Sequence, residues 1–351
     1  MSERKQRNRA PITERERQKR IQKKKAIRRK KRILIAKRLI AVSILVIVVV
    51  FALNKLTSIN NDSNKKATPA SVSVMKNASG NERDENGRVI SDVNEALGID
   101  IYSPKNLEGE ELYNTLSMLA SKSEKYASIY NNINLYPEKL LNAVCNNAEM
   151  ADFVLNYSGI SINTSNNFSN GKNNNLRNTN AVLTKEEKNA EFPLFLQWDE
   201  RWGYEEYGDT FVGVSGCAPT CVSMVVFALT GDENATPDVV ARYAKENDYY
   251  LRGTGTKWTF LTEGVKNFGI RGKEIALNKK QIISELKKGH PIICSMKSGI
   301  FTAQGHFIVL VGINGDKIIV NDPNSIAKSQ CLWDYEVLEA EIKNLWSYSA
   351  K

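Results

Sequence analysis

Cysteine chemistry is the first possibility that the sequence raises. Cys217 lies in the segment VSGCAPTC, and Pro219 suits the first turn of the apolar helix predicted to follow. The thiol is therefore expected at a helix N-terminus, where the helix dipole and free backbone N–H groups favour the nucleophilic thiolate. A buried structural cysteine is the alternative interpretation. Cys221, one turn further along among valines, is expected to be such a core residue.

A nucleophilic cysteine needs a base, and the chain has only two histidines. His290 precedes Pro291 at the end of a predicted helix, a setting that is typical of a surface or capping residue. His306 instead opens an apolar strand predicted over residues 307–313, and a polar residue at the end of a strand often borders a cleft. His306 is therefore the candidate base, with a structural role as the alternative.

An acidic residue close to His306 follows from a predicted hairpin. Asn314 and Gly315 separate two apolar runs, which is a strong hairpin signal. A three-residue loop at 314–316 would place Asn324 opposite His306 and Asp322 diagonally across the same face. Diagonal neighbours lie about 7–8 Å apart, within reach of an imidazole and a carboxylate. A two-residue loop would turn Asp322 to the other face, and Asp322 before a proline is also typical of a turn residue.

Two further arrangements concern the same candidates. Gln197, in LQWDERW, could donate its side-chain amide to an oxyanion beside the backbone N–H of the nucleophile, although by itself it resembles an ordinary surface glutamine. A zinc site made of Cys217, Cys221, Cys294 and His306 is conceivable, but two cysteines within one helix and two remote ligands match no usual zinc spacing. We therefore expect no metal and no cofactor.

The order of these residues resembles a known family. Gln, then Gly-Cys-x-Pro-Thr, Gly-His-Phe and Asn-Asp-Pro are similar to stand-alone relatives of the bacteriocin-processing, double-glycine peptidases of the papain superfamily. The resemblance runs from about Phe192 to Tyr348. It implies four roles: Cys217 as nucleophile, His306 as base, Asp322 as the residue that orients the base, and Gln197 in the oxyanion hole. Members usually have glycine after the nucleophile, where this chain has Ala218.

The resemblance implies a cysteine peptidase that cleaves peptide bonds through a thioester acyl-enzyme, with a peptide or protein as substrate. Two other functions stay open. A cell-wall peptide hydrolase or amidase of the same fold would also suit an outward-facing domain. A catalytically inactive binding module displayed at the surface is the other, and the presence of all four candidate residues argues against it.

Helices and then strands must position these residues. Over residues 191–351, helices are predicted at 217–229, 237–247, 257–268 and 279–288 and strands at 291–296, 307–313 and 317–320. This order predicts an α+β fold. A papain-like domain would combine an N-terminal helical part, which carries the nucleophile helix, with a C-terminal antiparallel sheet.

Charge and hydropathy define the N-terminal part. Residues 1–38 hold 18 Lys and Arg against three Glu. The positive charge of this segment alone is larger than the net charge of the whole chain, which is +10, so the rest of the chain is mildly acidic. This argues against a nucleic-acid-binding domain. Residues 39–56 are predicted to be a single transmembrane anchor, with a cleaved signal peptide as the alternative. The basic tail should remain cytoplasmic on anionic lipid, which places the catalytic domain outside the cell.

Composition divides the segment between the anchor and the predicted peptidase domain into three parts. Residues 57–100 are rich in Asn, Ser, Lys and Asp and are predicted to be a disordered stalk. Residues 101–155 carry leucines and valines at helical spacing and predict a small helical region. Residues 156–190 are rich in Asn and predict a second linker. Five cysteines at irregular spacing predict no disulfide framework, and the oligomeric state stays open.

Overall fold

In the computed structural model, residues 88–89, 91–157 and 181–351 are described. The predicted basic tail at 1–38 and the predicted anchor at 39–56 lie outside these residues, as do most of the predicted stalk and much of the Asn-rich linker. Within the described ranges, no helix combines the length and the apolar composition that a membrane crossing requires. All the described residues belong to one compact unit of the chain.

The α-helices of the predicted helical region include α3 (Gly109–Ala120), α4 (Glu124–Asn131) and α5 (Glu138–Asn146). Leu112, Leu116 and Leu119 lie on one face of α3 and are fully buried against α4 and α5. Two short 3-10 helices, η1 (Ile133–Leu135) and η2 (Ala148–Met150), flank α5, and residues 151–157 are helical.

The end of the predicted stalk departs from the expected disorder. Residues 92–97 form helix α2 (Asp92–Leu97), which ends at Gly98 in the left-handed conformation, with φ of 71°. Asn94 and Leu97 of this helix are buried. A side-chain bond from Asn94 to Asn147 and a backbone N–H bond from Ala148 to Asn94 attach α2 to the helical region. Composition could not show these contacts, because both partners come from a segment about fifty residues away.

The first half of the peptidase-like domain is helical, as predicted. After α7 (Lys185–Asn189) and α8 (Val212–Ser215), helix α9 (Cys217–Thr230) runs through the core with ten buried residues and ends at Gly231, with φ of 71°. Helix α10 (Pro237–Glu246) begins with proline in its first turn and packs on α9. The helix predicted at 257–268 is instead two 3-10 helices, η3 (Trp258–Leu261) and η4 (Gly264–Phe268).

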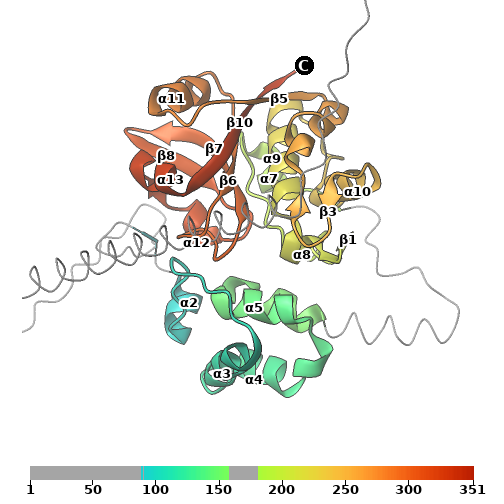
Figure 1. The fold of residues 1–351 in the computed structure, drawn as a ribbon, viewed down its shortest axis with the longest axis vertical. Coiled ribbons are helices and arrows are strands. Elements are labelled where there is room, and N and C mark those ends of the chain that lie inside the picture. The colour runs from blue at the N-terminus through green and yellow to red at the C-terminus, as the bar shows by residue number, and fades with distance from the viewer. Residues whose placement is uncertain (1–87, 90, 158–180) are drawn as a thin grey trace, which may run out of the picture. The chain divides into compact units, whose positions relative to one another are not determined.

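The second half is a six-stranded antiparallel sheet in the order β5-β10-β6-β7-β8-β9, the orange to red part of Figure 1. The strands are β5 (Ile270–Glu274), β6 (Ile292–Met296), β7 (His306–Asn314), β8 (Lys317–Asn321), β9 (Leu332–Trp333) and β10 (Ile342–Ala350). This confirms the predicted α+β order and three predicted strands. Two shorter hairpins, β1 (Glu206–Tyr207) with β2 (Thr210–Phe211) and β3 (Tyr250–Leu251) with β4 (Gly255–Thr256), lie outside this sheet.

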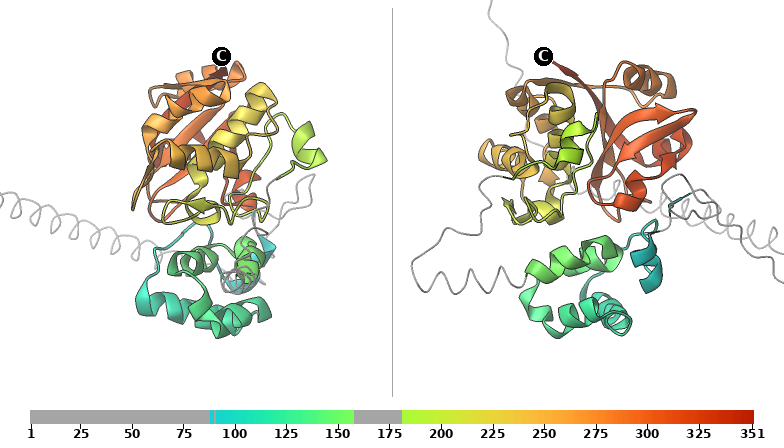
Figure 2. Two further views of the ribbon diagram at one scale, coloured as in Figure 1. Left: turned by 90° about the vertical axis from the view of Figure 1, so that its right-hand side faces the viewer. Right: turned by 180° about the vertical axis from the view of Figure 1, so that it is seen from behind.

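Helices cover both faces of the sheet, so its central strands are buried on both sides (Figure 2). Phe307 and Val309 of β7 pack with α9, whereas Ile308 and Leu310 pack with α11 (Lys279–Lys287) and α13 (Tyr335–Glu341). A short helix, α12 (Ile326–Ser329), follows β8. Strand β7 is therefore held in the middle of the domain, and its first residue is His306.

Specific contacts join the helical region to the peptidase-like domain. The ring of Phe153 stacks on Tyr204 with centroids 4.3 Å apart, and the Tyr204 hydroxyl donates to the Phe153 carbonyl at 2.6 Å. Glu149 accepts hydrogen bonds from the backbone N–H groups of Ile326 and Ala327 at 2.9 and 3.1 Å, where α12 begins. These bonds satisfy donors that a helix leaves free at its N-terminus.

Candidate active site

Cys217 is the first residue of α9 and is partly exposed, so its thiol lies at the helix N-terminus as the sequence indicated. Gly216 precedes it, and a Cβ there would meet the backbone oxygen of Val212 at 2.5 Å. Glycine therefore permits the close approach between α8 and the start of α9. Pro219 is buried in the first turn of α9.

The other four cysteines are buried, and all five are free thiols. Cys221 is fully buried, and its thiol lies 3.3 Å from the Phe307 carbonyl. Burial raises the pKa of the Cys221 and Cys294 thiols well above the usual range and raises the pKa of Cys145 to about 12. Cys217 is thus the only cysteine of the described residues with substantial solvent exposure.

His306 is bonded to Asp322 and lies near Cys217. Its Nε2 lies 2.7 Å from Oδ1 of Asp322, and Cys217 is close enough to raise the pKa of the ring. Both residues of the first pair are buried, with 8% of His306 and none of Asp322 exposed. Burial lowers the pKa of His306, but the charge and hydrogen bond of Asp322, together with Cys217, outweigh this effect and raise it to about 9.

Asp322 is fixed by the turn that follows β8. Its Oδ1 also accepts the backbone N–H of Asn324 at 2.8 Å, and its own N–H donates to the Ser329 hydroxyl at 2.9 Å. The Asn324 carbonyl in turn accepts bonds from the Asn147 side chain at 2.7 Å and the Trp198 indole at 3.1 Å. The helical region thereby contributes to holding the loop that carries Asp322.

The predicted three-residue hairpin loop is wrong, yet the pairing it predicted is found at Val309–Asn321 and Leu310–Val320. Asn314 pairs with Lys317, so the loop has two residues, and Gly315 at its first position has φ of 62°, as glycine favours in such turns. The register then shifts between Leu310 and Gly312, where β7 contains a β-bulge. Beyond the bulge, Leu310 pairs with Val320, which is the pairing that the longer loop would have produced.

Gln197 lies beside these residues. It is 4% exposed, its backbone N–H donates to the Pro323 carbonyl at 2.7 Å, and its side chain lines the same cavity as Cys217 and His306. Its Nε2 donates to the Gly213 carbonyl at 3.1 Å and lies 3.4 Å from the Val214 carbonyl. The Nε2 group thus makes one good hydrogen bond, to Gly213, and one long contact, to Val214, while Oε1 has no partner among the described residues.

His290 does not belong to this group. It lies at the end of the segment after α11, where Nδ1 contacts Glu285 at 2.9 Å. The pKa of Glu285 is lowered to about 2 by its hydrogen bonds to Lys288 and then His290. His290 does not line the cavity that contains Cys217 and His306.

The cavity beside Cys217 has a volume of about 1330 Å³ and walls from two parts of the chain. One wall comes from the peptidase-like domain, from residues within 197–217, 250–258, 295–307 and 324–328 together with Lys343. The other comes from residues 101–108 and 138–147 of the helical region. The sequence contained no local signal for this second wall, because it is created by packing between distant segments.

The described part of the chain contains no group of three or more His, Cys, Asp or Glu side chains that could hold a metal ion. Cys221 and Cys294 are buried thiols whose pKa values are raised by burial, and Cys221 already points to a backbone carbonyl.

Comparison with known proteins supports the resemblance drawn from the motifs. Residues 189–351 match the model of the Peptidase_C39 like family, which confirms a relationship to these papain-like peptidases over that part of the chain. The α+β, papain-like fold is therefore established for this domain. None of the curated proteins matches the chain.

Two solved structures are similar at low identity. The peptidase domain of ComA from Streptococcus, a bi-functional ABC transporter involved in a quorum sensing pathway, is 16% identical, with a TM-score of 0.31. The alignment covers 42% of this chain and 99% of that domain. A putative C39-like peptidase from Bacillus anthracis is 14% identical, with a TM-score of 0.29, and the alignment covers 48% of this chain and 97% of that one.

Proposed function

We propose that the domain of residues 189–351, which matches the C39-like peptidase family, is a cysteine peptidase that hydrolyses peptide bonds. The observation that supports this most strongly is the position of His306. It bonds to Asp322 at 2.7 Å, lines the same large cavity as Cys217, and is close enough to Cys217 for the thiol to raise its pKa. This is the geometry of a nucleophile, a base and a residue that orients the base.

In the proposed mechanism, His306 accepts the thiol proton of Cys217, and the thiolate attacks the carbonyl carbon of the substrate. Asp322 keeps the ring oriented and stabilises the imidazolium. His306 then donates the proton to the leaving amine as the C–N bond breaks, which leaves a thioester on Cys217. A water molecule, deprotonated by His306, hydrolyses the thioester and releases the second product.

The oxyanion formed during attack needs donors that point at it. We assign this role to the backbone N–H of Cys217 and the Nε2 of Gln197. The backbone donor is available because Cys217 is the first residue of α9. The N–H groups in the first turn of a helix have no carbonyl partner within that helix. The Gln197 donor that lies 3.4 Å from the Val214 carbonyl would turn to the substrate oxygen, while the bond to Gly213 holds the amide in place.

We further propose that the chain is a single-pass membrane protein with its peptidase domain outside the cell. The support is the apolar run at residues 39–56 behind a tail with 18 basic residues. Protease added to intact cells should then remove the peptidase domain. Protection of the domain until the membrane is broken would contradict this topology, and a mature form that starts after residue 56 would favour a signal peptide.

Cleavage of a peptide library tests the enzymatic proposal. The full-length protein, solubilised in detergent, is incubated with a proteome-derived library, and new termini are identified by mass spectrometry. We expect cleavage at a recurrent sequence, abolished in Cys217→Ala and strongly reduced in His306→Ala. His290→Ala is the matched control and should cleave normally. Cleavage that persists in Cys217→Ala would contradict the assigned nucleophile, and absence of any cleavage would favour a binding module.

A further inference from the structure

The cavity beside Cys217 is cationic although the chain beyond residue 38 is acidic overall. Six lysines and only two glutamates line it. The lysines are Lys105, Lys139, Lys257, Lys297, Lys328 and Lys343, and the glutamates are Glu108 and Glu138. A cleft lined by one sign of charge attracts ligands of the opposite sign. The charge of this cavity therefore differs from that of the domain that surrounds it.

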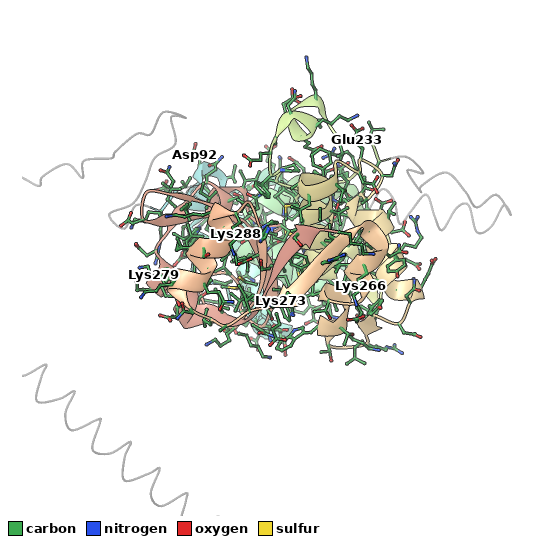
Figure 3. All side chains as sticks on the ribbon, turned by 90° about the horizontal axis from the view of Figure 1, so that it is seen from above. Asp92, Glu233, Lys266, Lys273, Lys279 and Lys288 are labelled. Carbon is green, nitrogen blue, oxygen red and sulfur yellow. The ribbon has the colours of Figure 1, made fainter. Side chains whose placement is uncertain are left out.

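Lys328 differs from the surface lysines. Figure 3 shows Lys266, Lys279 and Lys288 at the surface, and each has a carboxylate oxygen within 2.7 Å. Lys328 is only 4% exposed and lines the cavity. Its Nζ has no hydrogen-bond acceptor among the described residues, and its contact is with the Phe301 ring, whose centroid lies 5.9 Å away. Lys328 is thus a buried cation without an anion bonded to it.

Four acidic groups act on Lys328 through their charge, and each holds hydrogen bonds to other residues, although Oδ2 of Asp322 has no partner among the described residues. They are Asp322, Glu149, Glu341 and Asp100. Asp322 bonds to His306, Glu149 to the start of α12, Glu341 to the Ile300 N–H and Asp100 to the Tyr102 N–H. Burial lowers the pKa of Lys328, and these four charges offset the effect only in part.

The backbone of Lys328 is held by hydrogen bonds on both its N–H and its carbonyl. Its N–H donates to the Ser325 hydroxyl at 3.2 Å, which caps α12, and the carbonyl of Lys328 accepts the Trp333 indole at 3.0 Å. Phe301, which also lines the cavity, is 2% exposed. The side chain is almost wholly buried but lines the cavity, where a ligand would supply the acceptor that the described residues do not.

We propose that Lys328 binds a carboxylate of the substrate, and that the peptidase prefers acidic peptides. A carboxylate is the ligand that a buried ammonium requires, and the other lysines of the cavity would attract an acidic chain towards it. This proposal rests on the proposed peptidase function, because it assigns a substrate class to the same cavity. The carboxylate comes either from a Glu or Asp side chain or from the C-terminus of the peptide.

Two matched peptide libraries test the preference by cleavage. They differ only in that every Glu of one is Gln in the other, and each is made with free and with amidated C-termini. With the full-length protein, we expect kcat/KM for the acidic library to exceed that for the neutral one. Lys328→Met should lower it about 10- to 100-fold for the acidic library and leave the neutral library unchanged. Amidation should matter only if the C-terminal carboxylate is the group bound.

Two further variants show whether the preference depends on the positive charge of Lys328 itself, on the shape of its side chain, or on the overall charge of the protein. Lys328→Arg keeps the cation and should retain the preference for acidic peptides. Lys279→Met removes a surface lysine that pairs with Glu336 at 2.7 Å and should change neither library. Because a methionine replaces a buried cation, Lys328→Met should unfold at a temperature no lower than the wild type, which thermal unfolding monitored by circular dichroism measures.

Binding provides a measurement that does not depend on turnover. In a Cys217→Ala background, fluorescence anisotropy of the same labelled libraries should show binding of the acidic one, at least about tenfold weaker when Lys328→Met is added. Lys328-dependent binding without cleavage by the wild type would refute the peptidase function and keep the acidic ligand. Cleavage with no preference for acidic peptides would support the peptidase function and refute the acidic ligand.

Two other results would overturn the role of Lys328. An equal loss for the acidic and neutral libraries in Lys328→Met would mean that the lysine acts on the catalytic residues through Asp322 instead of on the substrate. Failure of the Cys217→Ala protein to bind the acidic library better than the neutral one would remove the proposed ligand altogether.

Discussion

The Nε2 of His306 and the Oδ1 of Asp322 lie 2.7 Å apart. The strand pairing at the tip of the hairpin, if it continued unchanged, would turn Asp322 to the opposite face of the sheet from His306. Asn314 pairs with Lys317 at the tip. The β-bulge between Leu310 and Gly312 then shifts the pairing by one residue. The contact between base and carboxylate therefore depends on the bulge as much as on the turn.

The first prediction concerns the pKa of His306. Asp322→Asn removes the charge that raises this pKa and leaves the burial that lowers it, so the pKa should fall from about 9 towards or below its ordinary value. Because the chain has two histidines, NMR of isotope-labelled His rings resolves both, with His290 as internal reference. An unchanged titration of His306 in Asp322→Asn would contradict the cause assigned here.

The same shift predicts how stability depends on pH. The pKa of His306 is about 9 in the folded protein and 6.5 in the reference state, so its contribution is fully present below pH 6.5 and is lost as pH rises through about 9. The contribution is at most about 3 kcal/mol. The difference in free energy of unfolding between wild type and His306→Asn, measured by denaturant titration, should shrink across this window. A difference that is constant or grows with pH would contradict the sign.

The reactivity of Cys217 is the third prediction. In the native protein at pH 6, iodoacetamide should alkylate Cys217 alone, because the other four cysteines are buried. His306→Ala should slow the labelling at pH 6, since no imidazolium stabilises the thiolate, and labelling should recover as pH rises. Peptide mapping by mass spectrometry measures this, and His290→Ala is the control. Equal labelling of Cys217 with and without His306 would remove the catalytic pair.

Gln197 gives the fourth prediction. Gln197→Ala should lower kcat by about 10²–10³ with a smaller change in KM, because an oxyanion donor acts mainly in the transition state. Gln197→Glu keeps the size but loses the donor and should behave similarly. The rate of Cys217 alkylation should be unaffected in both variants, which separates the role in catalysis from a general disturbance of the site. A kcat within a few-fold of wild type would leave Gln197 a structural residue bonded to Gly213.

The fifth prediction concerns the packing of the helical region on the peptidase domain. A Cβ at Gly213 would meet the ring of Phe153, so Gly213→Ala should destabilise the protein by about 1–3 kcal/mol. Phe153→Ala should make this substitution less harmful, as a double-mutant cycle in thermal unfolding would show. Gly203→Ala is the matched comparison, because its Cβ would also meet the Asp199 carbonyl at 2.8 Å and should not be rescued fully. Strictly additive effects of Gly213→Ala and Phe153→Ala would contradict the predicted contact.

Local sequence signals account for Cys217 and for the strand that begins at His306. The proline in the first turn and the apolar run after it mark α9, and the glycine and apolar run mark β7. The loop length was wrong because two- and three-residue loops share the same Asn-Gly signal. Gln197 stood out only through the family resemblance, since an isolated glutamine carries no local signal.

Other elements had no readable pattern. Strand β10 is buried on both faces over much of its length, which removes the alternation that identifies a strand, and β5 is mostly exposed. The segment 257–268 has apolar residues at helical spacing, but glycines at 264 and 269 accompany its division into two 3-10 helices. The wall that the helical region adds to the cavity, including Asn106 and Asn142, depends on contacts between distant segments.

The bulge in β7 also affects how related sequences should be aligned. A related chain could lack the bulged residue at Val311 and have one more residue in the hairpin turn. Its strands would pair without interruption, and its histidine and aspartate would lie as close together as they do here. Two such chains differ by one gap at the turn and one gap five residues before it. An alignment that closes both gaps to gain apparent similarity would match each residue of 312–314 with the wrong partner, and would make a shared geometry look like sequence divergence.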